Sequence, residues 1–246
     1  MTEKVIAGKK ALVTGASRGI GRAIAGALAS EGVDLFLTAR DGDILESLRK
    51  ELSKFNVKVG YNTADLTSEK EVNDLFADTI GFLKEINILI NNAGIGIRGD
   101  VADIEISDWE KMYSVNLKAA FMLSRLTARE MIKKRSGYII NIGSGASQTP
   151  MAGFAGYCAS KYGLLGFSES LGLELREHNI KVSIILPGST ATHFGGATPE
   201  DKISSKPGIL RPEDVADSVL YLLKQSGIAW TSVMNLRPLN LKKGSL

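Results

Sequence analysis

Three observations predict an α/β fold, a doubly wound parallel sheet of about seven strands with helices on both faces. Short apolar runs alternate with stretches in which apolar residues recur every three or four positions along nearly the whole chain. No change in composition marks a second domain, and the length of 246 residues suits one large α/β domain. We therefore expect a single domain over residues 1–246.

Composition argues against several classes of function. The net charge of +3 is slight for this length, so nucleic acid or an anionic membrane is not indicated as a partner. The lone cysteine, Cys158, cannot form an internal disulfide, and two histidines leave no cluster with zinc-ligand spacing. The first strand begins too early for a signal peptide, and no apolar run is long enough to span a membrane. We expect a soluble, cytoplasmic protein without a metal site.

The first strand, a glycine loop and a helix form a candidate phosphate-binding unit. Residues 11–14 are apolar, and helical periodicity begins after Gly21. Glycines let the backbone approach a ligand closely, and a helix N-terminus offers N–H groups to a pyrophosphate. Three glycines could instead form only a tight turn, but the strand–loop–helix context favours a dinucleotide. The loop residues of this candidate site are Gly15, Ser17, Arg18, Gly19, Ile20 and Gly21.

The second strand, over residues 34–38, ends just before Arg40. In a dinucleotide fold an acidic residue near this position binds the ribose 2′-hydroxyl, whereas an arginine accommodates a 2′-phosphate. Either Arg40 or Arg18 could be an ordinary surface charge. Two cations at these positions together indicate NADP(H) rather than NAD(H).

Two further segments lie where ligands bind in open α/β sheets. Asp65 and Leu66 could hold an adenine through a carboxylate and a backbone amide, or Asp65 could merely cap the next helix. The segment from Asn92 through Ala93 to Gly94 follows a strand, although it could be only a turn. Around these segments we expect a helix over 41–55, a strand over 57–61, a helix over 68–83 capped by Ser68 with Glu71, and a strand over 86–90.

The second half continues the alternation of strands and helices. Residues 189–210 have no clear period, and a loop of this length in a compact domain is often a substrate lid. The other expected elements are a helix over 107–134 capped by Ser107 and Asp108, a strand over 138–142, a helix over 156–176, a strand over 180–186, a helix over 211–223 with Pro212 in its first turn, and a strand over 228–235.

A tyrosine and a lysine in the predicted helix 156–176 are candidates for acid/base chemistry. Tyr157 and Lys161 are one helical turn apart and share a face, and Ser144 at a strand end would come close to them. A nearby cation lowers the pKa of a tyrosine from about 10, which would allow proton transfer near neutral pH. The pair alone is weak evidence, because such a spacing also arises by chance. Asn116, inside a predicted helix, is either a surface residue or a buried amide.

These motifs, in this order and spacing, resemble those of the short-chain dehydrogenase/reductase family over nearly the whole chain. Residues 14–21 resemble the family's TGxxxGxG cofactor loop, and residues 91–94 resemble its NNAG segment. The family also has a Pro-Gly segment that passes the nicotinamide, and this segment is resembled here by Pro187 and Gly188 with Thr190 and Thr192 after them. The family's catalytic tetrad corresponds to Asn116, Ser144, Tyr157 and Lys161.

The resemblance implies a Rossmann fold and an NADP(H)-dependent oxidoreductase that interconverts a ketone or aldehyde and an alcohol by hydride transfer. It implies that Ser144 hydrogen-bonds the substrate carbonyl and that Tyr157 gives or removes the proton. Lys161 would lower the pKa of Tyr157 and hold the nicotinamide ribose, and Asn116 would fix a water that links Lys161 to solvent. It also implies a homotetramer or dimer built on the helices around 107–134 and 157–176.

The substrate is open at this point. Residues 11–24 resemble bacterial 3-oxoacyl-acyl-carrier-protein reductases, which makes a thioester reductase the alternative. Residues 232–238 (SVMNLRP) depart from the Asn-Gly-Gly of those enzymes and favour a broader group of carbonyl reductases. A protein that binds NADP(H) without turnover is the third possibility. The expected substrate pocket lies near 94–100, 145–156 and 189–210 and includes Ile95, Met151, Phe154, His193 and Phe194.

Overall fold

A computed structural model describes residues 5–194, 196, 198–205 and 208–239 of the chain. At its centre is a seven-stranded sheet with the order β3-β2-β1-β4-β5-β6-β7. All six neighbouring pairs are parallel, which confirms the predicted doubly wound sheet of the Rossmann type. The strands are β1 (Lys10–Thr14), β2 (Asp34–Ala39), β3 (Val59–Thr63), β4 (Ile88–Asn91), β5 (Gly137–Ile142), β6 (Ile180–Pro187) and β7 (Val233–Leu236).

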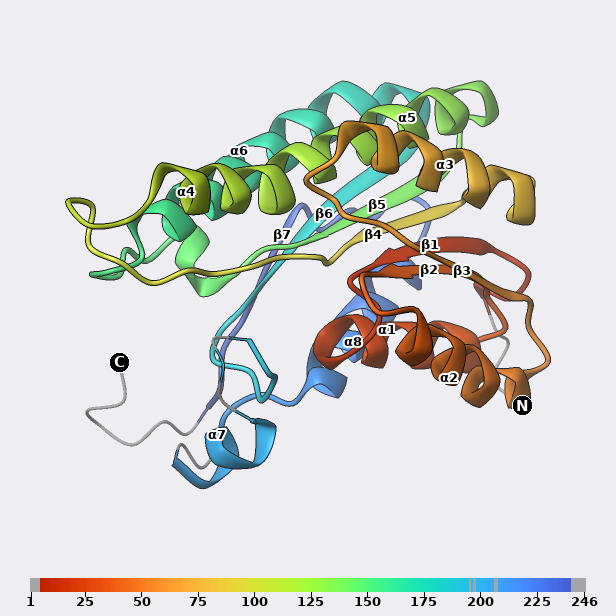
Figure 1. Ribbon diagram of the computed structural model, residues 1–246. Helices are drawn as coiled ribbons and strands as arrows, with labels where there is room; N and C mark the ends of the chain where they lie inside the picture. The colour runs from red at the N-terminus through yellow and green to blue at the C-terminus, as the bar shows by residue number, and fades with distance from the viewer. Residues whose placement is uncertain (1–4, 195, 197, 206–207, 240–246) are drawn as a thin grey trace.

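Helices cover both faces of the sheet (Figure 1). One face carries α1 (Gly19–Ser30), α2 (Gly42–Leu52) and α8 (Pro212–Leu223), and the other carries α3 (Glu69–Leu83), α5 (Ala119–Lys134) and α6 (Ala155–Leu175). Each layer has its own buried apolar cluster, and the predicted leucine stripe of α2 lies in the first. Burial on both faces explains why the central strands are almost wholly apolar.

The strand order reverses between β1 and β4. The chain runs outward from β1 to β3 and then returns through α3 to place β4 on the other side of β1. Ligands of open α/β sheets bind at such a switch point, outside the carboxyl ends of the strands. The pairing of Val13 with Ile90 brings the ends of β1 and β4, and hence Thr14 and Asn91, next to each other at this place.

The predicted helix over 107–134 is interrupted, and its predicted cap is wrong. The helix begins at Ile106 as α4 (Ile106–Tyr113), and the residue before it, Glu105, makes no capping hydrogen bond with its side chain. A π-helical turn, η2 (Ser114–Lys118), then joins α4 to α5. Single π turns inside helices are often found at functional sites, and this one contains Asn116.

The segment over 189–210 contains a short helix that the sequence analysis missed, α7 (Pro199–Ser205). Thr198 and Asp201 cap it reciprocally: the Asp201 N–H donates to the Thr198 hydroxyl at 3.1 Å, and the Thr198 hydroxyl donates to the Asp201 carboxylate at 2.8 Å. Thr followed by Pro and, three residues later, an acidic residue is a recognisable helix start. Residues 195, 197, 206 and 207 of the expected lid lie outside the described residues.

Three strands begin later than expected. β7 begins at Val233 rather than at 228, because Ile228 is fully exposed and a turn links the Ala229 N–H to the carbonyl of Ser226. β3 begins at Val59 rather than at 57, and β4 begins at Ile88 rather than at 86. All three corrections concern residues at the amino-terminal ends of the strands, so they leave the carboxyl ends, where ligands bind, unchanged. None of the helices in the described part of the chain is long and apolar enough to cross a membrane.

Candidate active site

The glycine loop forms a tight cradle at the N-terminus of α1. Gly15 and Gly19 have φ values of +66° and +55°, in the left-handed region that favours glycine. The residue before the helix, Arg18, makes no capping hydrogen bond with its side chain. Gly19, Ile20 and Gly21 form the first turn, so their N–H groups have no partner within the helix. No acidic side chain lies in this turn, which suits a bound phosphate group.

Thr14 and Asn92 fasten this cradle to the loop after β4. The Thr14 hydroxyl accepts hydrogen bonds from the N–H groups of Asn92 and Ala93, each at 3.0 Å. The Asn92 side-chain amide donates to the carbonyls of Thr14 and Gly15, at 2.9 and 3.1 Å. The sequence analysis did not assign Thr14 a role, although a hydroxyl residue at the end of a strand before a glycine loop is a usable indication.

The segment after β6 closes the cradle from a third side. A Cβ placed on Gly19 would lie 3.2 Å from Cγ2 of Thr192, and one placed on Gly15 would lie 2.9 Å from Cα of Ala93. Thr190 forms a bridge with Leu210, which draws the segment after Pro187 and Gly188 back over the sheet. Three loops predicted to bind the cofactor therefore meet at the switch point.

The two arginines predicted to bind the 2′-phosphate are available for that role. Arg18 and Arg40 are both exposed, and neither forms an ion pair within the described residues. Arg18 precedes α1, and Arg40 directly follows β2, the next strand outward from β1. An anionic ribose phosphate at the outer end of the cradle would meet both charges, so the donor set fits NADP(H).

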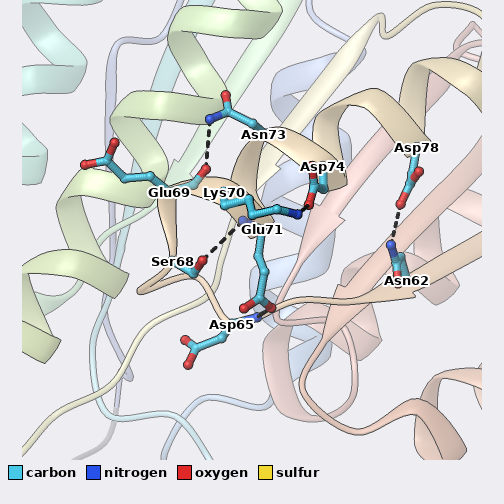
Figure 2. Close-up of polar contacts among 9 residues, drawn as sticks. All are labelled: Asn62, Asp65, Ser68, Glu69, Lys70, Glu71, Asn73, Asp74 and Asp78. Carbon is cyan, nitrogen blue, oxygen red and sulfur yellow. Dashed lines mark hydrogen bonds and ion pairs between the residues drawn. The ribbon is translucent and has the colours of Figure 1, made fainter.

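Asp65 follows β3 and keeps an exposed carboxylate (Figure 2). Its Oδ1 accepts hydrogen bonds from the N–H and the hydroxyl of Thr67, both at 2.9 Å, and these bonds lower the pKa of Asp65. The Asp65 N–H donates to Glu71, while the Glu71 N–H donates to Ser68, which caps α3 as predicted. Leu66 lines a cavity of about 10 Å³ with Thr14 and Ala93. Asp65 thus shapes its loop, and its position as an adenine ligand stays a prediction.

Tyr157 lies near the start of α6 with its side chain almost fully buried. Burial raises the pKa of Tyr157 to about 12, although a hydrogen bond with the Ser144 side chain acts in the opposite direction. The rings of Phe154 and Phe194 pack against it, with centroids 6.3 and 5.4 Å from that of Tyr157. The predicted contact of Ser144 with Tyr157 is therefore present, and two apolar rings pack against the tyrosine.

Lys161 is buried one turn further along α6, where its ammonium donates to the carbonyl of Ile142 at 3.0 Å. Burial lowers the pKa of Lys161 to about 8. The ammonium lies 5.9 Å from the centroid of the Tyr157 ring. The expectation that Lys161 lowers the pKa of Tyr157 is not met in the structure of the chain alone, because burial, which raises this pKa, is the largest influence and Lys161 is not among the groups that lower it.

Asn116 is a buried amide rather than a surface residue. Its Oδ1 accepts from the N–H of Ile95, and its Nδ2 donates to the Ile95 carbonyl, both at 2.8 Å, and to the Ser160 hydroxyl at 2.9 Å. A Cβ placed on Gly94 would lie 3.3 Å from Oδ1 of Asn116 and 3.4 Å from Nζ of Lys161. Asn116 and Lys161 therefore flank the same glycine in the loop after β4.

The buried charge of Lys161 predicts a pH dependence of stability. Between about pH 8 and the ordinary lysine pKa, the unfolded chain holds a proton that folded Lys161 has released, so stability rises with pH. From about pH 7 to about pH 9.5 we expect a gain of about 2 kcal/mol in the free energy of unfolding relative to Lys161→Met. Urea denaturation of both proteins at the two pH values measures it. Parallel pH profiles for the two proteins would show that burial does not lower the pKa of Lys161.

A switch-point cradle for a dinucleotide beside a buried Tyr/Lys pair defines a nicotinamide-dependent oxidoreductase. The chain belongs to the short-chain dehydrogenase family, whose model matches residues 9–203. A 3-oxoacyl-(acyl-carrier-protein) reductase FabG from Aquifex aeolicus (strain VF5) is 36% identical over 225 residues, which cover 89% of this chain and 91% of the relative.

Solved structures agree with this assignment. An alcohol dehydrogenase from the archaeon Thermococcus sibiricus, complexed with 5-hydroxy-NADP, has a TM-score of 0.88 and 27% identity, covering 94% of this chain and 97% of that one. A metagenomic short-chain oxidoreductase in complex with NADP has a TM-score of 0.85 and 34% identity, covering 96% and 99%. The chain is an NADP-dependent oxidoreductase that acts on small molecules, and NADP(H) is its cofactor.

Proposed function

We propose that this enzyme interconverts a ketone or aldehyde and an alcohol, with Tyr157 as general acid in reduction and general base in oxidation. The observation that carries the proposal is the contact of the Ser144 and Tyr157 side chains beside the cofactor cradle, with Lys161 one turn away. Bound NADP(H) would supply or accept the hydride. The chain itself supplies the proton, positions the substrate against the cofactor and keeps water out of the site.

Each member of the tetrad has a role that its surroundings support. The Ser144 hydroxyl would bind the substrate oxygen and stabilise the alkoxide that develops there. With a pKa of about 12, Tyr157 holds its proton at neutral pH and is ready to donate it. Lys161, which lies one turn along α6 beside Gly94, would bind the ribose next to the nicotinamide. Asn116 fixes the backbone of Ile95 and would position a water near Lys161.

The alternative substrate class is a 3-oxoacyl thioester. The identity with the Aquifex reductase favours this alternative, whereas residues 232–238 (SVMNLRP), around the last strand β7, lack the Asn-Gly-Gly expected of those enzymes near this strand. NADPH consumption with acetoacetyl thioester, compared with α-diketones, aldehydes and a cyclic ketone, separates the two. Turnover of the thioester far above all ketones would establish the alternative, and NADPH binding without turnover of any of them would argue against both.

The preference for NADP(H) depends on Arg18 and Arg40. We expect Arg40→Ala to raise the Kd for NADPH about 10- to 100-fold, because a charge-assisted hydrogen bond to a phosphate is lost. The Kd for NADH, which lacks the 2′-phosphate, would stay within about threefold. Fluorescence titration of the nicotinamide measures both constants. Unchanged NADPH affinity in the double variant Arg18→Ala with Arg40→Ala would contradict this assignment.

The extent of the domain, the substrate lid and the cellular location are each inferred from a separate observation. We infer that residues 1–246 act as one domain whose segment 189–210 is the substrate lid, supported by the contact of Phe194 with Tyr157. Met151 and His193, which the sequence analysis expected at the substrate pocket, are exposed. Cys158 is buried and free, which supports a reducing, cytoplasmic location.

A second copy of the chain would cover the outer face of α5 and α6, giving a dimer or tetramer. This face has an apolar groove of about 460 Å³, and Phe121 and Tyr162 on it are 48% and 43% exposed. We expect Phe121→Glu to lower the molar mass of the protein in solution to that of a smaller oligomer or a monomer, because the glutamate places a charge in the contact between two copies of the chain. Light scattering measures the mass. An unchanged mass in this variant would place the contact elsewhere. The groove is lined by Tyr113, Ser114, Leu117, Lys118, Phe121, Gly163 and Phe167.

A further inference from the structure

Arg237 lies beside the loop over residues 143–154, between β5 and α6, although it comes from the far end of the chain; this loop contains Ser144 and is called the catalytic loop below. It follows β7, which runs alongside β6 so that Leu236 pairs with Pro187 (Figure 1). A Cβ placed on Gly188 would lie 3.6 Å from Cδ of Arg237, and one placed on Gly145 would lie 2.6 Å from its Nη1. The side chain therefore extends past the end of β6 to the residue directly after Ser144.

The absence of a side chain on Gly145 makes this arrangement possible. Any larger residue there would displace the guanidinium. Gly145 opens a short 3₁₀ turn, η3 (Gly145–Ser147), and the Ala146 N–H donates to the Ser144 hydroxyl at 3.1 Å. The charge thus lies against the loop that holds the proposed ligand of the substrate oxygen.

The charge of Arg237 is not neutralised by the protein. It is exposed, and within residues 5–194, 196, 198–205 and 208–239 it forms no ion pair and no side-chain hydrogen bond. The other nearby cation, Lys161, already donates to the Ile142 carbonyl. Arg98 lies at the opposite end of the catalytic loop, against Gly153, where the carboxylate of Asp100 is also close. Arg237 is therefore the cation beside Ser144 that has its donors open.

We propose that Arg237 binds a carboxylate of the substrate, so that the enzyme acts on an oxo acid and the corresponding hydroxy acid. A guanidinium presents paired N–H donors that match a carboxylate, and it stays charged at every relevant pH. The rings of Phe154 and Phe194 on Tyr157 provide an apolar wall for the carbon chain. This inference rests on the proposed function, because it places the carbonyl at Ser144 and Tyr157.

A structural role is the competing explanation. Arg237 could only brace the loop from Ser144 onward against the end of β6. In that case its loss would disturb Ser144 and slow every carbonyl substrate equally. Substrate recognition instead predicts a loss confined to anionic substrates and expressed mainly in KM.

The test compares 2-oxo, 3-oxo and 4-oxo acids with their methyl esters as substrates of the NADPH-loaded enzyme. We expect the wild type to prefer the best acid to its ester about tenfold or more in kcat/KM. Arg237→Met should lower kcat/KM for that acid about 10- to 100-fold, mainly through KM, and for the ester less than about threefold. Arg237→Lys should restore part of the loss, because it keeps the charge without the paired donors.

Arg176→Met is the matched control, since it removes the same charge from an exposed residue beyond the opposite end of α6. It should leave both substrates unchanged. Esters used as well as acids by the wild type, or an equal fall for both in Arg237→Met, would overturn the role of Arg237 while leaving the carbonyl chemistry intact.

If the enzyme turns over none of these compounds, that result counts against the proposed function. Binding measurements then decide whether the carboxylate site exists. Calorimetry with the NADP⁺-loaded protein measures the affinity for an oxo acid and its ester. Binding of the acid that weakens about tenfold or more in Arg237→Met would support the carboxylate site. Equal affinity of both proteins for the acid, or no binding of it, would overturn the site.

Discussion

Tyr157→Phe is expected to lower kcat by about 10²- to 10⁴-fold, since it removes the group that moves the proton. The change deletes only the hydroxyl. The ring keeps its contacts with Phe154 and Phe194, so the fold and the cofactor cradle should persist. The Kd for NADPH should stay within about threefold of the wild-type value, because one hydrogen bond at most is lost from the cofactor side. Steady-state kinetics and fluorescence titration give both quantities.

Tyr221→Phe is the matched control for this variant. Tyr221 lies on α8, on the other face of the sheet, and its side chain is 60% exposed. The same chemical change there should leave kcat and the Kd for NADPH unaltered. If Tyr157→Phe kept more than about a tenth of the wild-type kcat, another group would have to move the proton.

Gly21→Ala should damage the cofactor site through the backbone. A Cβ at this position would lie 2.2 Å from the carbonyl oxygen of Gly15 and 2.5 Å from the side-chain nitrogen of Asn92. The first contact is with the backbone, and the Asn92 amide is held by its hydrogen bonds to the carbonyls of Thr14 and Gly15, so α1 must shift away from the loop. We expect a loss of about 1–3 kcal/mol in the free energy of unfolding. The affinity for NADPH should fall about tenfold or more, because the N–H groups at the start of α1 move.

Gly26→Ala tests whether the effect is specific to the cradle. Gly26 lies in the same helix, and a Cβ there would meet no atom within 4 Å. Alanine at this site should stabilise the protein by about 0.5–1 kcal/mol, because glycine is a poor residue in a helix interior. Urea denaturation and NADPH titration of both variants measure the contrast. Equal behaviour of the two variants would show that Gly21 and Gly15 are not in tight contact.

Much of the fold was predictable because the pattern of apolar residues is periodic. The leucine stripe of α2 and the strand β1 follow from sequence spacing, which tertiary structure did not override. Strand ends were less predictable: residues 228–232 read as strand but turn at Ser226–Ala229, and the Trp230 indole there donates to the Val182 carbonyl. The π turn around Asn116 was not predictable, because it depends on hydrogen bonds to Ile95, twenty-one residues away in sequence.

The candidate site divides in the same way. Gly15, Gly19 and Gly21 are recognisable because their spacing reflects a local backbone requirement. The position of Arg237 beside Gly145 is not, since it arises from the pairing of β6 with β7 between segments distant in sequence. The pKa of Tyr157 was expected to be low from the neighbouring cation, but its burial, which a sequence does not report, raises it to about 12.

The most direct measurement of the proposed chemistry follows the hydride itself. NADPH that carries deuterium at both hydrogen positions of the reactive ring carbon is mixed with the enzyme and the best carbonyl substrate, and the product is analysed by mass spectrometry. Hydride transfer to a carbonyl predicts one deuterium on the carbinol carbon for each NADPH oxidised, with the alcohol proton drawn from solvent through Tyr157. Oxidation of NADPH without an alcohol that carries deuterium at that carbon would contradict a carbonyl reductase.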